Sequence, residues 1–119
     1  MVVQLPSVET RFEEFARKNG FRPIGHRRIP GGDIYVAERY YPNGLPEGNA
    51  VNKGKSFYRI MWSIRARSFL SGKAAFRGNY ADLNARVFQT QTERFELGVK
   101  EAMEWLELMK QANVRRRRA

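Results

Sequence analysis

The sequence predicts an α+β fold: an antiparallel sheet of three to four strands, flanked by a short N-terminal helix and packed against a long C-terminal helix. Three observations support this. Apolar residues recur at helical spacing near both ends of the chain, apolar and polar residues alternate in its middle, and glycine and proline cluster between these segments. The 119 residues are 42% hydrophobic, so we expect a single domain in residues 1–112, followed by a basic C-terminal tail at 113–119.

The N-terminal helix is expected to begin after Ser7, whose hydroxyl can cap the first free backbone N–H groups. It is expected to end at Asn19 and Gly20, because glycine readily takes the left-handed conformation that closes a helix. Between these signals the apolar residues recur at helical spacing, at Val8, Phe12, Phe15 and Ala16. The segment is therefore predicted to form one short amphipathic helix.

A β-hairpin is predicted next, with strands at residues 21–29 and 34–41. The segment between them reads Pro-Gly-Gly-Asp, which is typical of a tight turn. Residues 42–55 then include three glycines and two prolines, with little that can anchor them in a core. We expect this segment to be a mobile loop.

The clearest strand signal lies at residues 56–67. Apolar side chains occupy alternate positions and would share one face of a sheet, namely Tyr58, Ile60, Trp62, Ile64 and Ala66. The positions between them would share the other face, namely Arg59, Met61, Ser63, Arg65 and Arg67. The strand is therefore predicted to bury one side and to present a cationic surface on the other. A turn at 70–73 and a strand at 74–80 are expected to follow, and residues 81–91 show no clear pattern.

The C-terminal helix is expected to begin near residue 92, because Thr90 and Glu93 have the spacing of a capping box and Thr92 is a second suitable cap. It is predicted to run to about Ala112. One apolar stripe follows its length, at Phe95, Val99, Ala102, Met103, Leu106 and Met109. This stripe is predicted to pack on the apolar face of the sheet, while the glutamates of the helix lie on its outer faces.

Charge is distributed unevenly along the chain, which has 22 Lys and Arg against 12 Asp and Glu, a formal net charge of +10. No acidic residue occurs between Gly48 and Ala81, although that stretch is rich in Lys and Arg. These cations repel one another, and a polyanion would relieve the repulsion while releasing its condensed counterions. The sequence therefore predicts a non-catalytic nucleic-acid-binding protein, with DNA slightly favoured over RNA and single or double strands left open.

Phosphate contacts are expected mainly from a basic sheet and loop surface, assisted by the arginine run at the C-terminus. The candidate binding residues are Lys53, Lys55, Arg59, Arg65, Arg67, Lys73, Arg77, Arg115, Arg116, Arg117 and Arg118. Aromatic residues lie among them, and Phe57, Phe69 and Phe76 are candidates for stacking on unpaired bases. The alternative for the strand arginines is that they pair with glutamates of the C-terminal helix or cover the sheet with their methylene stems.

A second interpretation is a small protein-interaction or accessory factor, of a phage type, that docks on an acidic protein partner or on a nucleoprotein assembly. Leu97, Trp105 and Leu108 lie off the main apolar stripe of the C-terminal helix. These three residues are candidates for a protein contact or for the seam of a homodimer.

Several function classes lack the residues that they need. The chain has no cysteine and one histidine, so it offers no disulfide, no thiolate nucleophile and no histidine-rich metal site, and no cofactor is predicted. It contains neither a P-loop nor a Gly-x-Gly-x-x-Gly motif. No apolar run reaches the roughly 18 residues of a membrane span, so we expect no membrane partner and a cytoplasmic location.

One enzymatic alternative is a degenerate metal-dependent nuclease. An acidic N-terminal helix followed by Asp33 at the start of a strand resembles the opening of the restriction-type nuclease fold, in which an aspartate and a Glu-x-Lys strand hold Mg²⁺ and position water. The next strand has Ser63 where that pattern requires glutamate, and Glu38 would lie on the opposite strand face from Asp33. We therefore predict that the chain is not an enzyme.

Overall fold

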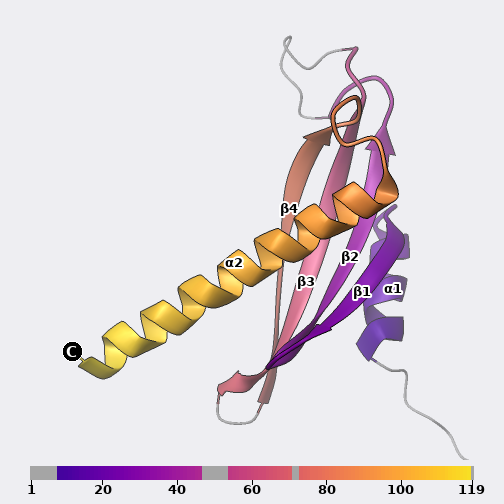
Figure 1. Ribbon diagram of the computed structural model, residues 1–119. Helices are drawn as coiled ribbons and strands as arrows, with labels where there is room; N and C mark the ends of the chain where they lie inside the picture. Colours follow the sequence, from indigo (N-terminus) through magenta and orange to yellow (C-terminus); the bar gives the residue numbers. More distant parts are fainter. Residues whose placement is uncertain (1–7, 47–53, 71–72, 119) are drawn as a thin grey trace, which may run out of the picture.

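The computed structural model describes the backbone of residues 8–46, 54–70 and 73–118, and the side chains of residues 11–46, 54–65 and 80–112. In chain order the elements are α1 (Val8–Lys18), β1 (Arg22–Ile29), β2 (Gly32–Tyr41), β3 (Phe57–Leu70), β4 (Lys73–Asn84) and α2 (Gln91–Arg118). The strands form one antiparallel sheet in the order β1-β2-β3-β4. The predicted α+β fold is confirmed, and Figure 1 shows α2 crossing one face of the sheet with α1 behind β1 and β2.

The end of α1 confirms the predicted cap. The N–H of Phe21 donates to the carbonyl of Ala16 at 2.8 Å. The N–H of Gly20 donates to the carbonyl of Arg17 at 3.0 Å, which completes the paired bonds of a Schellman motif. Gly20 takes the left-handed conformation that this motif requires, with φ of 83°. The cap turns the chain directly from α1 into β1.

The predicted hairpin is confirmed, although its turn is tighter than the sequence suggested. Ile29 pairs with Gly32 across the sheet, so only Pro30 and Gly31 form the turn. Gly31 has a φ of 84°, and proline followed by glycine in this conformation is typical of a type II turn. Asp33 is consequently part of β2, where its side chain can take part in contacts across the sheet.

Parts of two predicted connections lie outside the described residues, as does the predicted cap Ser7. These parts are residues 47–53 of the loop and residues 71–72 of the turn between β3 and β4. Where the loop is described, the N–H of Gly54 donates to the carbonyl of Asn43 at 3.2 Å. This bond joins the two ends of the loop beside the start of β3.

β3 and β4 are both longer than predicted. β3 continues to Leu70, and β4 continues through residues 81–84, which show no clear pattern in the sequence. Two contacts account for the longer β4. The side chain of Leu83 is buried in the core, and the carboxylate of Asp82 pairs with Arg59 on β3.

The larger core lies between the sheet and α2, which confirms that the apolar face of β3 packs on the C-terminal helix. Its buried members are Ile34, Val36, Ile60, Trp62, Ile64, Leu83, Val99, Ala102 and Leu106. Trp62 is the largest of the fully buried side chains. Its ring centroid lies 6.2 Å from that of Trp105, which packs on the core from α2.

α2 is rotated about its axis relative to the predicted stripe. Met103, which was expected to face the core, is 48% exposed, so this part of the prediction is wrong. Gly98 lies at the interface instead, because a Cβ there would be 2.8 Å from Cγ1 of Val36. The missing side chain lets α2 approach the sheet closely, and that approach brings Trp105 onto the core. Residue spacing identifies an apolar stripe but does not fix its centre.

A second, smaller core lies on the opposite face of the sheet, beneath α1. Its members are Phe12, Ala16, Phe21, Tyr35, Ala37 and Met61. Met61 belongs to the face of β3 that was predicted to be cationic, yet it is only 4% exposed. The prediction of a continuous cationic surface is therefore wrong for the described part of β3. Arg59 and Arg65 lie on either side of a buried apolar residue.

The two ends of α2 differ in how well the sequence predicts them. The N–H of Glu93 donates to Oγ1 of Thr90 at 3.1 Å, so Thr90 is the cap and the helix begins at Gln91, close to the predicted start. At the other end the helix continues to Arg118 rather than ending near Ala112. The predicted basic tail is thus mostly the last part of α2, which Figure 1 shows extending past the edge of the sheet at β4.

Candidate functional site

The predicted binding residues are only partly described. The structure describes the side chains of Lys55, Arg59 and Arg65, whereas Lys53 lies outside the described residues. The others are described by their backbones alone, in β3, β4 and the last turns of α2: Arg67, Lys73, Arg77, Arg115, Arg116, Arg117 and Arg118. For these residues phosphate binding stays a prediction.

Arg59 is held within the sheet. Its Nε and Nη2 donate to the two carboxylate oxygens of Asp82 on β4, at 2.8 and 3.2 Å. This fork-like arrangement keeps the guanidinium against the sheet, where the side chain is 19% exposed. Arg59 therefore pairs with Asp82, which is the first acidic residue after the stretch between Gly48 and Ala81, and not with a glutamate of α2. Asp82 offsets much of the charge that Arg59 brings to this face.

Arg65 lies in a row of charged residues that crosses three strands. In the register of the sheet it is opposite Asp33 of β2, which is in turn opposite Arg28 of β1. Asp33 is buried, and its Oδ1 lies 3.5 Å from Nε2 of His26. The Nε of Arg65 is buried without a hydrogen-bond partner. This row therefore places two arginines on either side of one carboxylate, that of Asp33.

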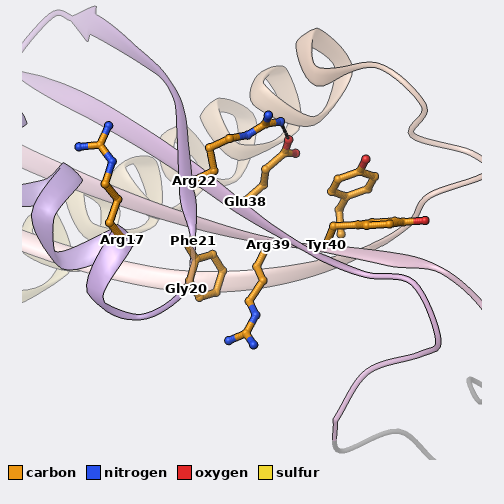
Figure 2. Close-up of a pocket in the computed structure, with 8 residues that line it drawn as sticks. Arg17, Gly20, Phe21, Arg22, Glu38, Arg39 and Tyr40 are labelled. Atoms are coloured by element: carbon orange, nitrogen blue, oxygen red, sulfur yellow. Dashed lines mark hydrogen bonds and ion pairs between the residues drawn. The ribbon is translucent and has the colours of Figure 1, made fainter.

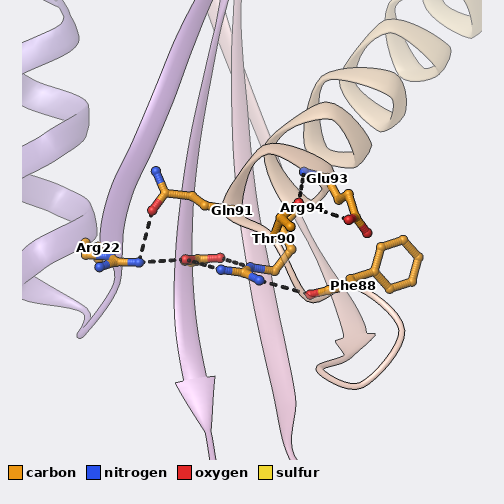
Figure 3. Close-up of polar contacts among 7 residues, drawn as sticks. Arg22, Phe88, Thr90, Gln91, Glu93 and Arg94 are labelled. Carbon is orange, nitrogen blue, oxygen red and sulfur yellow. Dashed lines mark hydrogen bonds and ion pairs between the residues drawn. The ribbon is translucent and has the colours of Figure 1, made fainter.

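A buried ion pair joins the opposite face of the sheet to α2. Glu38 of β2 and Arg94 of α2 are both almost inaccessible to solvent. The Nε of Arg94 donates to Oε2 of Glu38, and its Nη2 donates to Oε1 at 3.1 Å. The third donor, Nη1, bonds the carbonyl of Phe88 at 2.9 Å, as Figure 3 shows. The hydrogen bond to Glu38 raises the pKa of Arg94, so the guanidinium stays charged.

Arg22 completes this network at the surface. Its Nη2 donates to Oε1 of Glu38 at 2.9 Å and to Oε1 of Gln91 at 3.2 Å, while its side chain is 68% exposed. Two guanidinium groups thus share one buried carboxylate. The network carries a net charge of +1, and Arg22 brings that charge to solvent.

A cleft opens where β1 stops pairing with β2. β1 begins at Arg22, opposite Glu38, while β2 continues to Tyr41 without a strand on that side among the described residues. The cleft has a volume of about 680 Å³. Figure 2 shows its lining, which comes from α1, the turn into β1, β2 and β3: Arg17, Gly20, Phe21, Arg22, Glu38, Arg39, Tyr40 and Tyr58.

Positive charge exceeds negative charge in this cleft. Within the described part of the chain Arg39 forms no ion pair; its guanidinium lies 5.0 Å from the ring centre of Tyr41. It also lies against the turn, since a Cβ on Gly20 would be 2.9 Å from its Nη1. Arg17 contacts Glu13 at 3.4 Å but remains largely exposed. The carboxylate of Glu38 is already shared, so the cleft contributes no free anion of its own.

Aromatic rings adjoin these arginines on both faces of the sheet. Tyr40 is 50% exposed, and its ring centre lies 4.8 Å from that of Tyr58. A second cavity of about 330 Å³ lies beside the cleft, lined by Asn19, Phe21, Tyr41, Arg59, Tyr80 and Asp82. This edge of the sheet thus combines guanidinium groups with accessible rings.

The ion pairs leave several cations without a carboxylate. Arg27 is bound by Glu96 of α2 at 2.8 and 2.5 Å, a bond that lowers the pKa of Glu96. Once this pair and those above are assigned, the following cations of the strands and of the loop before β3 form no ion pair with any described residue: Arg28, Arg39, Lys55 and Arg65. Two of them, Lys55 and Arg65, belong to the predicted set.

Sequence reasoning missed four residues of the cleft, namely Arg17, Arg22, Arg39 and Tyr40. Each had a signal in the sequence. Arg17 stands three residues before the predicted helix cap and Arg22 two residues after it, so a tight turn brings them near each other. Arg39 and Tyr40 end the predicted strand 34–41. These four residues line one cleft because β1 begins opposite Glu38 while β2 continues to Tyr41. The sequence does not specify this difference in strand length.

The predicted protein-contact residues of α2 do not form one exposed surface. Leu97 and Trp105 are partly buried against the larger core, whereas Leu108 is 60% exposed. The two partly buried residues therefore contribute to the fold. Leu108 alone of the three is largely open to solvent.

Three further findings bear on the function. Within the described residues no group of three or more His, Cys, Asp or Glu side chains is placed to hold a metal ion. None of the described helices has the length and apolar character to cross a membrane. Comparisons with protein-family models, with curated proteins and with solved structures give no match to this chain. Its function must therefore follow from the chemistry of its own residues.

Proposed function

We propose that this protein binds nucleic acid without catalysing a reaction, through contacts between its unpaired cations and the phosphate backbone. DNA is the first ligand to test, and a cytoplasmic location belongs to the same proposal. The observation that carries it is the surplus of positive charge on the sheet after every described ion pair has been assigned. Arg28, Arg39 and Arg65 come from three different strands and form no ion pair with any residue whose side chain the structure describes.

The spacing of these arginines suits an extended polyanion. Arg65 lies in the row that contains Asp33, and Arg39 lies six residues further along β2. At about 3.4 Å per residue, the two rows are roughly 20 Å apart on the face of the sheet that carries α1. Because α1 covers the rows between them, a nucleic acid would meet these positive points on either side of that helix. Phosphate contacts of this kind give affinity with little base preference.

The acid-free stretch between residues 48 and 81 adds to this support, because its lysines and arginines face no carboxylate nearby in sequence. Lys55 is exposed at the start of β3 and lies within that stretch. Docking on an acidic protein would use the same charges. The two functions are separated by whether free oligonucleotide binds the purified protein.

We expect the triple variant Arg28→Gln/Arg39→Gln/Arg65→Gln to bind a fluorescent 20-mer at least about tenfold more weakly than the natural protein. Three partly exposed charge contacts at about 0.5–1 kcal/mol each account for that factor. The measurement is fluorescence anisotropy with single-stranded DNA, duplex DNA and single-stranded RNA at one ionic strength. Thermal unfolding verifies that the variant is folded.

The matched control is Arg86→Gln/Lys100→Gln/Lys110→Gln, which removes the same charge from exposed positions outside the sheet. We expect this control to lose much less affinity. Equal losses in the two variants would show that only net charge matters and would contradict a sheet-based site. A natural protein that ignores all three oligonucleotides would refute nucleic-acid binding itself.

A further inference from the structure

We infer that the cleft beside the end of β2 binds a short segment of a single strand, with one phosphate held by Arg39 on the α1 side of the sheet edge, a neighbouring phosphate near Arg22 on the α2 side, and an unpaired base stacked on Tyr40. This inference rests on the proposed nucleic-acid binding and adds the strandedness of the ligand and the residues that select it. It assigns a role to three residues that charge counting along the sequence did not single out.

The size and charge of the cleft fit this ligand. A volume of about 680 Å³ lies within the range of pockets that hold small organic ligands. Arg39 has no ion pair among the described residues, and Arg22 shares its carboxylate with Arg94. A phosphate on the α1 side of the edge would therefore meet Arg39, and a phosphate on the α2 side would meet Arg22, while the carboxylate of Glu38 in the lining is already bonded.

Arg39 and Tyr40 are adjacent near the end of β2, where no described strand pairs with the outer edge of β2. Successive side chains of a strand point to opposite faces, so these two groups flank the edge of the sheet from its two sides. Figure 2 shows the Arg39 guanidinium and the Tyr40 ring directed away from each other, with Arg22 beside Glu38. A single strand that crosses this edge can place a phosphate on Arg39 on one side and an unpaired base on Tyr40 on the other.

The ring of Tyr40 is supported and accessible at once. It packs on Tyr58 with ring centroids 4.8 Å apart, and Tyr58 itself is fixed by the guanidinium of Arg94 at 3.6 Å from its ring centre. Half of Tyr40 remains exposed. A ring held in this way loses little freedom when a base stacks on it, and stacking of this kind is available only to unpaired bases.

A peptide added as a strand along the free edge of β2 is the competing occupant. Such a peptide would bond the backbone of residues 39–41 and would have no need for an exposed ring on one side of the edge and an arginine without a described ion pair on the other. The combination of rings with cations therefore favours nucleic acid. An acidic peptide serves as a competitor in the experiment below.

The test is the affinity of oligo(dT)₂₀ and of a 20-base-pair duplex for the natural protein, Tyr40→Leu, Tyr40→Phe and Arg39→Gln. We expect Tyr40→Leu to weaken binding of oligo(dT)₂₀ by about 5- to 150-fold, the range for loss of one stacked base. Tyr40→Phe keeps the ring and should bind like the natural protein. Duplex affinity should change little with Tyr40→Leu. Arg39→Gln should make the salt dependence shallower by about one phosphate contact.

Phe15→Leu is the matched control, because Phe15 of α1 is about as exposed as Tyr40 but lines neither the cleft nor the second cavity. We expect it to retain the natural affinity for oligo(dT)₂₀. Equal effects of Tyr40→Leu and Phe15→Leu, or equal losses for oligo(dT)₂₀ and duplex, would overturn the inference. The inference would also be overturned if octaglutamate displaced oligo(dT)₂₀ from the natural protein but not from Arg39→Gln, while Tyr40→Leu left the affinities for oligo(dT)₂₀ and for the duplex unchanged.

The two proposals fail in different ways. If the natural protein binds neither oligo(dT)₂₀ nor duplex, nucleic-acid binding is refuted and the site falls with it. If it binds both and the variants of Arg39 and Tyr40 behave like the natural protein, only the cleft is refuted. Thermal unfolding of each variant distinguishes loss of binding from loss of structure. If Tyr40→Leu does not fold, the separate variants Tyr40→Phe and Arg39→Gln still test the site.

Discussion

Replacing Glu38 by alanine is expected to lower the free energy of unfolding by about 3–5 kcal/mol. The substitution leaves the guanidinium of Arg94 buried, with its two bonds to the carboxylate lost. Water cannot readily reach that charge, so the cost of desolvating it is no longer offset. Urea unfolding monitored by circular dichroism measures the change.

Two further variants isolate the buried pair from the rest of the network. Arg22→Ala removes the exposed partner of the same carboxylate, and we expect it to cost no more than about 1 kcal/mol. The double variant Glu38→Leu/Arg94→Leu replaces both charges by apolar groups and should recover much of the stability lost in Glu38→Ala. A Glu38→Ala protein as stable as the natural one would show that Arg94 is not dependent on this carboxylate.

Replacing Trp62 by alanine is expected to destabilise the fold by about 3–5 kcal/mol. Trp62 is 2% exposed and lies between the sheet and α2, where it contacts Trp105. The variant loses the largest fully buried side chain and leaves a void that a sheet held on both sides by neighbouring strands cannot fill. Guanidinium chloride unfolding gives the free energy.

Leu108→Ala is the control for this prediction, because Leu108 is a large apolar residue that is 60% exposed. Its removal should change the stability by no more than about 0.5 kcal/mol. Similar effects of the two substitutions would mean that Trp62 is not part of a well-packed core. The contrast also tests the observed rotation of α2, which places Trp105 toward the sheet.

Local signals in the sequence predict the elements of this fold well. Gly20 closes α1, Pro30 and Gly31 form the hairpin turn, and Thr90 caps α2. Each of these depends on the conformational preference of one or two residues. The alternation in β3 likewise identifies the side of the strand that packs on α2.

Other features depend on how the elements pack together, and the sequence does not reveal them. Met61 belongs to a cationic pattern, but α1 covers it because that helix packs on the same face. Arg94 looks like one of many charges on a polar helix, although its spacing from Gly98 places it on the packed side. The cleft arises from a difference in strand length at Tyr41, which only the register of the sheet defines.

The candidate site was accordingly predicted only in part. Counting residues between 48 and 81 predicts a cationic segment, and Lys55 and Arg65 of that segment form no ion pair with a described residue, whereas Arg28 and Arg39 lie outside it. Which cations remain unpaired depends on contacts far apart in sequence, such as Arg59 with Asp82 or Arg27 with Glu96. These pairings exclude some arginines and leave Arg39 available.

The dependence of affinity on salt tests the central claim most directly. If at least three phosphates are contacted, the logarithm of the affinity for a single-stranded 20-mer should fall with the logarithm of the salt concentration with a slope of about −2 or steeper. Between 50 and 200 mM salt, at about −0.7 per contact, the affinity would then fall about 15-fold or more. An affinity that stays constant across that range would contradict binding through unpaired cations.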